Sequence, residues 1–265
     1  MKPEELQFVR EAFDFLDHPS LVVRIANSLG RPVEVAFDRL PVKHHDMIRK
    51  VTERALQQGL RVVSKTVGPN HSARNFSLSN TDSRRIGALH ALASAGVGAV
   101  GGFFGVFSLP FEIPVTTSIL LRSILSTAHE FGMNIDDPEV QLECLYILGL
   151  GSNRGMTENA YWVSRVAFSN LVRAAGTALG TKNYTAPVLV QFLSGIAARF
   201  EVVVTEKLMA EALPVVGAFG GGLINAAFTD YFSQAARYHF GLRALEGRYG
   251  RREIENIFQT QTRTS

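Results

Sequence analysis

The chain has 265 residues, of which 46% are hydrophobic, and a formal net charge of +3. Its mean hydropathy of +0.09 is high for a soluble enzyme and low for a protein built only of membrane spans. A peripheral or interfacial membrane protein fits between these classes. The length allows one or two domains with a large core. The lone Cys144 excludes an internal disulfide and suits a reducing cytosol, and the acidic start predicts no secretory signal peptide.

Basic charge is concentrated in two segments. Residues 42–85 carry nine basic and three acidic side chains, and residues 237–265 carry six and three. These segments are expected to face an anionic partner such as lipid head groups. Nucleic acid is not an expected partner, because Phe76 is the only aromatic residue among the basic residues of 42–85 on which a base could stack.

The first quarter of the chain reads as a series of helices, because apolar residues recur at intervals of three and four. Helices are predicted over residues 4–17, 19–30, 32–40 and 43–67, and a polar loop over 68–83. The fourth is amphipathic, and its basic residues share one face: Lys43, Lys50, Arg54, Arg61 and Lys65. This face is either solvated or in contact with a membrane surface.

Two uncharged, glycine-rich stretches follow, Ile86–Phe111 and Ala212–Thr229. Glycine inside a helix costs about 1 kcal/mol relative to alanine, so we expect close backbone packing to compensate. Three glycine pairs lie four residues apart, on one helix face: Gly98 with Gly102, Gly101 with Gly105, and Gly217 with Gly221. The fold class predicted is all-α, a multi-helix bundle with two central glycine-rich apolar helices. Whether these helices span a bilayer or form a soluble core stays open.

Neither a cofactor nor a metal site is expected. Gly96 to Gly101 matches the letters of a dinucleotide-binding fingerprint, but no strand precedes it and the first acid, Glu112, comes too soon. His129-Glu130 lacks the second histidine of a zinc-protease motif.

The second half of the chain is also predicted to be helical. Pro110 and Pro114 predict a non-helical corner around Glu112. Asp137 and Pro138 are a strong helix start. Helices are predicted over residues 115–131, 137–149, 157–179 and 185–211, followed by a final pair made of the second glycine-rich stretch and the segment up to Tyr249. The domain organisation expected is a helical segment at 1–41, a helical domain at 42–258 and a tail at 259–265.

Three residues are the acid–base candidates for any catalysis: Glu112, Glu206 and His239. Glu112 fits a proton donor with a raised pKa, or a helix cap paired with a base such as Arg122, and the structural role is favoured. His239 is expected to be a hydrogen-bonded core histidine. Cys144 lies on an apolar helix face, where a buried, inert thiol is the ordinary case.

Two motifs resemble those of a known family. The first runs from Leu109 to Pro114 and continues at Leu121-Arg122. The second comprises Glu206-Lys207, residues 214–221, Asn225, Ala236, His239-Phe240, Arg243, Leu245-Glu246 and Tyr249-Gly250. Together they are similar to the EcsC family over roughly residues 15–258. The resemblance implies a bacterial cytosolic or membrane-associated protein whose founding member is encoded beside an ABC transporter linked to secretion. It implies no catalytic residue set.

Two functions remain as hypotheses. The first is a non-enzymatic protein of the cytoplasm, peripheral to or partly inserted in the inner membrane, that meets head groups through residues 43–65 and through Arg251 and Arg252. It would shelter apolar lipid chains and serve a membrane transporter. The second is a hydrolase or peptidase acting on lipid or peptide, for which the three acid–base candidates should share one cleft.

Overall fold

The fold is all-α in the part of the chain that the structure describes. The computed structural model describes residues 1–17, 42–65, 109–150, 160–211 and 217–262, and these contain helices and no strand. The helices are α1 (Pro3–Leu16), α3 (Val42–Lys65), α5 (Leu109–Glu130), α6 (Pro138–Leu148), α7 (Ala160–Gly180), α8 (Pro187–Glu211), α9 (Gly217–Tyr249) and α10 (Arg251–Thr262). The predicted fold class is thereby confirmed.

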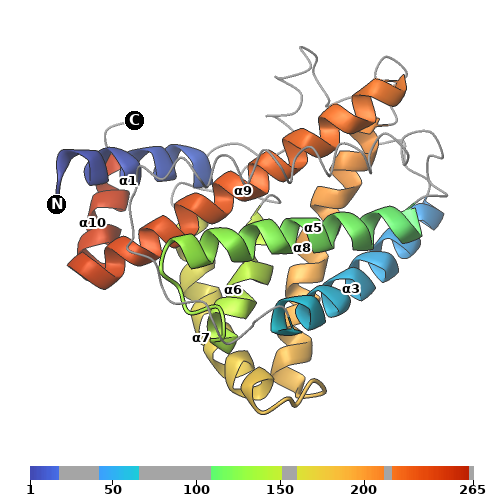
Figure 1. The fold of residues 1–265 in the computed structure, drawn as a ribbon, viewed down its shortest axis with the longest axis horizontal. Coiled ribbons are helices and arrows are strands. Elements are labelled where there is room, and N and C mark those ends of the chain that lie inside the picture. Colours follow the sequence, from blue (N-terminus) through green and yellow to red (C-terminus); the bar gives the residue numbers. More distant parts are fainter. Residues whose placement is uncertain (18–41, 66–108, 151–159, 212–216, 263–265) are drawn as a thin grey trace.

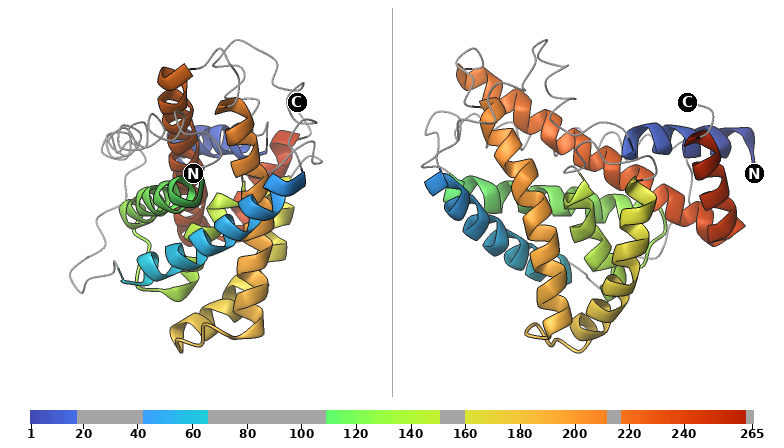
Figure 2. Two further views of the ribbon diagram at one scale, coloured as in Figure 1. Left: turned by 90° about the vertical axis from the view of Figure 1, so that its right-hand side faces the viewer. Right: turned by 180° about the vertical axis from the view of Figure 1, so that it is seen from behind.

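The helices are arranged around α9, which is 33 residues long and runs diagonally through the molecule (Figure 1). α1 and α10 pack against α9 at one end of the long axis. At the other end α3 packs on both α5 and α8. α6 and α7 fill the space between, and Figure 2 shows α7 and α8 joined as a hairpin at the lower edge. The surface formed by α3 and α8 is therefore distant from α1 and α10.

Local signals set several helix ends as the sequence predicts. The Asp137 side chain accepts a hydrogen bond of 2.8 Å from the backbone N–H of Glu139, which caps the start of α6. Pro138 occupies the first turn of α6, and Gly149 ends it. Gly250, at φ +88°, separates α9 from α10, a conformation that strains any residue with a Cβ.

The predicted corner at Pro110–Pro114 is wrong, because both prolines lie inside α5. A proline in the first turn of a helix loses no intrahelical hydrogen bond, since the N–H groups there have no partner in any case. Pro114 lies only one turn further, so it removes a single bond near the helix end. The Ser118 hydroxyl also donates to the Pro114 carbonyl at 2.8 Å.

The predicted final pair is also wrong, because α9 continues from Gly217 to Tyr249 without a break. The helix that the sequence analysis missed is α10, which crosses the boundary placed after Phe258. Phe258 is fully buried against the ring of Phe13, at 5.0 Å between centroids. Burial thus extends the ordered helix into the segment expected to be a tail.

The glycine pairs of the first apolar stretch, at Gly98, Gly101, Gly102 and Gly105, lie outside the described residues. Gly217 and Gly221 lie on α9, but their surroundings are likewise outside the description. The packing of the two glycine-rich stretches against each other stays a prediction.

Close helix packing at glycine occurs elsewhere in the described part. A Cβ on Gly59 of α3 would come within 2.3 Å of the Leu121 side chain on α5. A Cβ on Gly241 of α9 would come equally close, 2.3 Å, to the Phe8 ring on α1. These two glycines let α3 and α1 approach their neighbouring helices closely.

Candidate functional site: the face formed by α3 and α8

The solvent-exposed side of α3 is basic. Arg49, Lys50, Arg54 and Arg61 are all exposed, and the only acid among the exposed or half-buried residues of this helix is Glu53, for the part of α3 whose side chains are described. Arg49 forms an i,i+4 ion pair of 3.3 Å with Glu53. The side chains of Lys43 and Lys65 fall outside the description. We call Lys50, Arg54 and Arg61 the basic face.

The opposite side of α3 is apolar and buried. Ile48 and Leu56 are fully buried, and Ala55 and Leu60 nearly so. Because residues three and four apart share a helix face, this stripe fixes the rotation of α3 and turns the basic face to solvent. The predicted amphipathic helix over residues 43–67 is confirmed as α3, and Lys50, Arg54 and Arg61 lie on its exposed side.

Four exposed residues along one side of α8 carry no charge, although the half-buried, acidic Glu201 lies on the same side. Val190, Ser194, Ala198 and Val202 follow one another at intervals of four residues and are all exposed, Val190 by 49% and Val202 by 39%. We call these four residues the uncharged ridge. The charged Arg199 on the same helix points elsewhere, since its guanidinium donates to the Ser164 hydroxyl of α7 at 2.9 Å.

A groove of about 460 Å³ lies between the basic face and the uncharged ridge. Its α3 wall includes Gln57, Leu60 and Arg61, and its α8 wall includes Val190 and Ser194. The groove shows that the two surfaces border each other. Of the basic face only Arg61 lines the groove, together with the acidic Glu53, so the two surfaces meet at Arg61.

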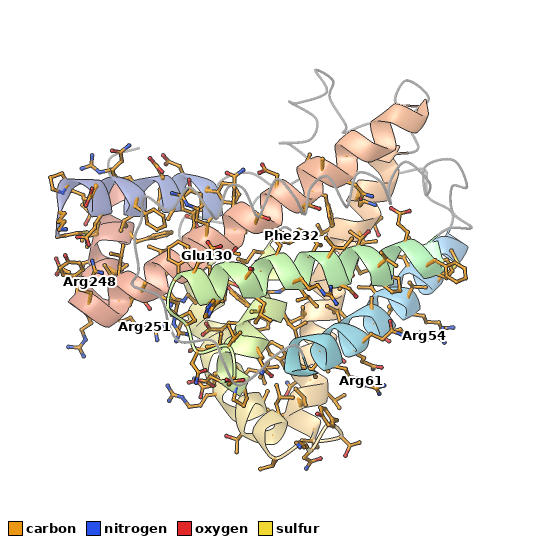
Figure 3. All side chains as sticks on the ribbon, in the orientation of Figure 1. Arg54, Arg61, Glu130, Phe232, Arg248 and Arg251 are labelled. Atoms are coloured by element: carbon orange, nitrogen blue, oxygen red, sulfur yellow. The ribbon has the colours of Figure 1, made fainter. Side chains whose placement is uncertain are left out.

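The second basic group predicted to meet head groups, Arg251 and Arg252, is also exposed, but it lies elsewhere. Figure 3 places Arg251 at the opposite end of the long axis from Arg54 and Arg61. These two arginines are therefore not part of the α3–α8 face.

Glu112, the first acid–base candidate, forms a buried ion pair with Lys207 of α8. The two side chains are only 4% and 5% exposed. The Lys207 ammonium also lies 5.8 Å from the centre of the Phe228 ring on α9. The structural role favoured for Glu112 is supported, but the expected partner was wrong: Arg122 is exposed.

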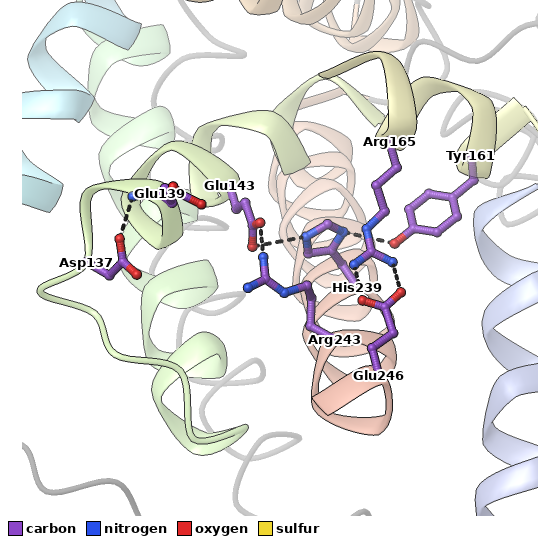
Figure 4. Close-up of polar contacts among 8 residues, drawn as sticks. All are labelled: Asp137, Glu139, Glu143, Tyr161, Arg165, His239, Arg243 and Glu246. Carbon is purple, nitrogen blue, oxygen red and sulfur yellow. Dashed lines mark hydrogen bonds and ion pairs between the residues drawn. The ribbon is translucent and has the colours of Figure 1, made fainter. Parts of the chain in front are cut away.

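His239, another acid–base candidate, is the centre of a buried polar network between α6, α7 and α9 (Figure 4). The Tyr161 hydroxyl lies 3.0 Å from its Nδ1, and Glu143 Oε2 lies 3.7 Å from its Nε2. A proton on Nε2, facing the carboxylate, leaves Nδ1 to accept the hydrogen bond from Tyr161. Arg243 pairs with the other oxygen of Glu143.

A second ion pair reinforces the same network. Arg165 of α7 donates two hydrogen bonds to the Glu246 carboxylate of α9, at 2.6 and 2.7 Å. His239 is 1% exposed and Tyr161 is fully buried, and neither lines the α3–α8 groove. The network therefore cross-links three helices and does not present reactive groups to a substrate in the described part of the molecule.

Burial changes the proton affinities in this network. It lowers the pKa of His239, which Glu143 raises only in part, and the Arg165 charge lowers it further. Burial raises the pKa of Glu143, but His239, Arg243 and Arg165 outweigh it and hold this pKa below its usual range. Burial also raises the pKa of Tyr146 to about 12 and the pKa of the Cys144 thiol well above its usual range. The folded state therefore favours the neutral forms of His239, Tyr146 and Cys144 and the ionised form of Glu143.

A pH-dependent stability follows from His239. The pKa of His239 in the folded state lies below the ordinary value of 6.5. As the pH falls below 6.5, the unfolded chain therefore binds more protons at this residue than the folded chain does. The free energy of unfolding should therefore fall as the pH is lowered from 6.5, and a further fall should begin below 4.5 as Glu143 is protonated. Urea unfolding at pH 7.5, 6.5 and 5.5 measures the first fall. His239→Asn should reduce the dependence of the free energy of unfolding on pH, and His129→Gln should not. If His239→Asn and wild type show the same dependence, His239 is not its source.

The acid–base candidates do not come together. Phe228, which packs on Lys207, and His239 are eleven residues apart on α9, about 16 Å along the helix axis. The side chain of Glu206 falls outside the description. In the described ranges no three His, Cys, Asp or Glu residues gather as they would around a metal ion. The sequence analysis named His239 but missed its partners Glu143 and Tyr161, because no local spacing links α6, α7 and α9.

The comparison with protein families agrees with the resemblance seen in the motifs. The model of the EcsC protein family matches residues 14–245, which is most of the chain. No curated protein and no solved structure matches the chain. Because the family match extends from α1 nearly to the end of α9, the chain belongs to the EcsC protein family.

Proposed function

We propose that this protein is a non-enzymatic, peripheral membrane protein that binds an anionic lipid surface through the face formed by α3 and α8. The observation that supports this most is the pairing of the basic face with the uncharged ridge across a shared groove. Surfaces of this kind bind at the head-group level, with cations among the anionic head groups and apolar side chains in the boundary of the acyl region.

The size of the expected attraction follows from the number of charges. Each lysine or arginine near an anionic membrane surface contributes about 1 kcal/mol. Three basic residues therefore supply about 3 kcal/mol, or roughly a hundredfold in affinity. This attraction should weaken at high salt, since exposed charges are screened over about 10 Å at 0.1 M ionic strength.

Peripheral binding fits α8 better than a membrane span does. Pro187–Thr205 is the one segment of the described helices that is long and apolar enough to cross a membrane, and a core helix of a soluble protein meets the same criterion. One side of it packs in the core, with Phe192 and Ile196 fully buried. Crossing a bilayer would expose this side, so we place only the uncharged ridge in contact with lipid.

The proposed location is the cytoplasmic side of the inner membrane. The family resemblance adds a membrane transporter of the ABC class as the expected neighbour there. The basic face is suited to such a location because the cytoplasmic leaflet carries anionic lipids.

Vesicle flotation tests the proposal. Wild type should float with vesicles of phosphatidylcholine and phosphatidylglycerol and stay behind with phosphatidylcholine alone. Lys50→Glu/Arg54→Glu/Arg61→Glu should lower the partition coefficient for anionic vesicles at least about a hundredfold, by the loss of three favourable charges. Arg251→Glu/Arg252→Glu is the matched control and should retain most of the binding, because these residues lie at the other end of the molecule. Equal flotation of wild type with both kinds of vesicle, or none with either, would refute the proposal.

A further inference from the structure

The groove between α3 and α8 has the size and lining of a site for one lipid-like molecule. Its volume of about 460 Å³ falls in the range of small-molecule pockets, about 300 to 1,000 Å³. We propose that it binds a single acyl chain with an anionic head group, such as a fatty acid. The inference rests on the proposed function, since the groove opens on the same α3–α8 face. It adds that the groove binds one ligand molecule per protein chain.

The apolar part of the groove can cover an acyl chain. Leu60 contributes from α3, and Val190, Leu193 and Ala197 contribute from α8. Val190 is 49% exposed, so apolar surface there is in water until something covers it. An acyl chain along this wall would remove that surface from water, at about 25 cal/mol per Å² buried.

The polar part of the groove suits an anionic head. Arg61 lines it, and Gln57, Ser194 and Thr185 add hydrogen-bonding groups. Glu53 also lines it, but Arg49 pairs with this carboxylate at 3.3 Å. With Arg49, Lys50, Arg54 and Arg61 against Glu53, the exposed side of α3 has an excess of positive charge. This excess favours a carboxylate or phosphate over a cationic head.

Titration calorimetry with fatty acids below their micelle concentration tests the inference without any membrane. Laurate and myristate should bind the full-length protein with one-to-one stoichiometry. Each added methylene should tighten binding up to about fourfold, as expected for a buried CH₂. Methyl myristate, which lacks the charge, should bind about tenfold more weakly, because a hydrogen bond to a charged group is lost.

Two pairs of variants distinguish the groove from the surrounding surface. Ser194→Trp fills the groove, whereas Ala198→Trp places the same side chain on the exposed ridge outside its lining. Arg61→Gln removes the lining cation, whereas Arg251→Gln removes an exposed cation at the other end of the molecule. Ser194→Trp and Arg61→Gln should each weaken myristate binding at least about tenfold, and the two controls should change it less than threefold.

The outcomes separate this inference from the proposed function. Myristate binding that Ser194→Trp and Ala198→Trp affect equally, or no myristate binding at all, would overturn the inference whatever the flotation result. Saturable myristate binding with the expected variant pattern, in a protein that does not float with vesicles, would support the groove and refute membrane binding. Circular dichroism of each variant confirms that the helices remain.

Discussion

Lys207→Met should destabilise the protein by about 3 to 5 kcal/mol, the range found when one partner of a buried ion pair is removed. Lys207 and Glu112 are 5% and 4% exposed, so the variant leaves a carboxylate buried without its cation. Phe200, Val204 and Phe228 around the pair are apolar and carry no cation that could replace Lys207, although the hydroxyls of Thr116 and Thr117 lie nearby. The midpoint of urea unfolding at pH 7.5 measures the effect.

A double variant separates the cost of an unpaired charge from the cost of lost packing. Glu112→Met/Lys207→Met should recover most of the loss, since replacing both partners of a buried pair by apolar residues is often neutral or stabilising. Lys50→Met, on the exposed side of α3, is the matched control and should change stability by less than about 0.5 kcal/mol. A loss below about 1 kcal/mol in Lys207→Met would contradict the buried pair.

Phe232→Ala should cost a similar amount, about 3 to 5 kcal/mol, through lost burial and the cavity left behind. Phe232 of α9 is fully buried, with ring centroids 6.1 Å from Phe200 of α8 and 5.1 Å from Phe228. It lies at the junction of α8 and α9 near the centre of the molecule (Figure 3). Thermal or urea unfolding gives the free-energy change.

The matched control for this substitution is Phe111→Ala, because Phe111 is 77% exposed. It should change the free energy of unfolding by less than about 0.5 kcal/mol. Similar losses in the two variants would mean that α8 and α9 do not pack through Phe232.

Much of the fold could be predicted from the sequence because its signals are local. The 3.6-residue period of the apolar residues predicted α1, α3, α7 and α8, with ends that agree with the structure to within a few residues. The Asp137-Pro138 start and the Gly149 end of α6 are likewise set by neighbouring residues. Such signals need no knowledge of which helices pack together.

The errors at α9 and α5 arose where tertiary packing outweighs local preference. α9 continues as one helix beyond its glycine-rich stretch, where a break was expected, and α5 stays helical through two prolines, which disfavour helix interiors. α10 is amphipathic, with Ile254 and Phe258 four residues apart on its buried side, and the sequence analysis overlooked this local pattern. Intrinsic propensity is a weak guide in such segments, since burial contributes more than propensity costs.

The candidate site was only partly predictable. The basic face could be read from the spacing of Lys50, Arg54 and Arg61 along one helix. The uncharged ridge and the groove could not, because they depend on α8 packing beside α3, over 120 residues later in the chain. The partners of Glu112 and His239 were missed for the same reason.

Site-specific fluorescence tests the central claim, membrane contact through the α3–α8 face, most directly. The only cysteine, Cys144, is fully buried, so a cysteine introduced at an exposed position can be labelled selectively with a polarity-sensitive fluorophore. Gln57 and Ala198 are exposed residues of the α3–α8 face, and Gln7 is an exposed residue of α1, at the opposite end. With anionic vesicles, we predict a blue shift and stronger emission for Gln57→Cys and Ala198→Cys and little change for Gln7→Cys. A shift at position 7 in bound protein, with none at 57 and 198, would contradict membrane contact through this face.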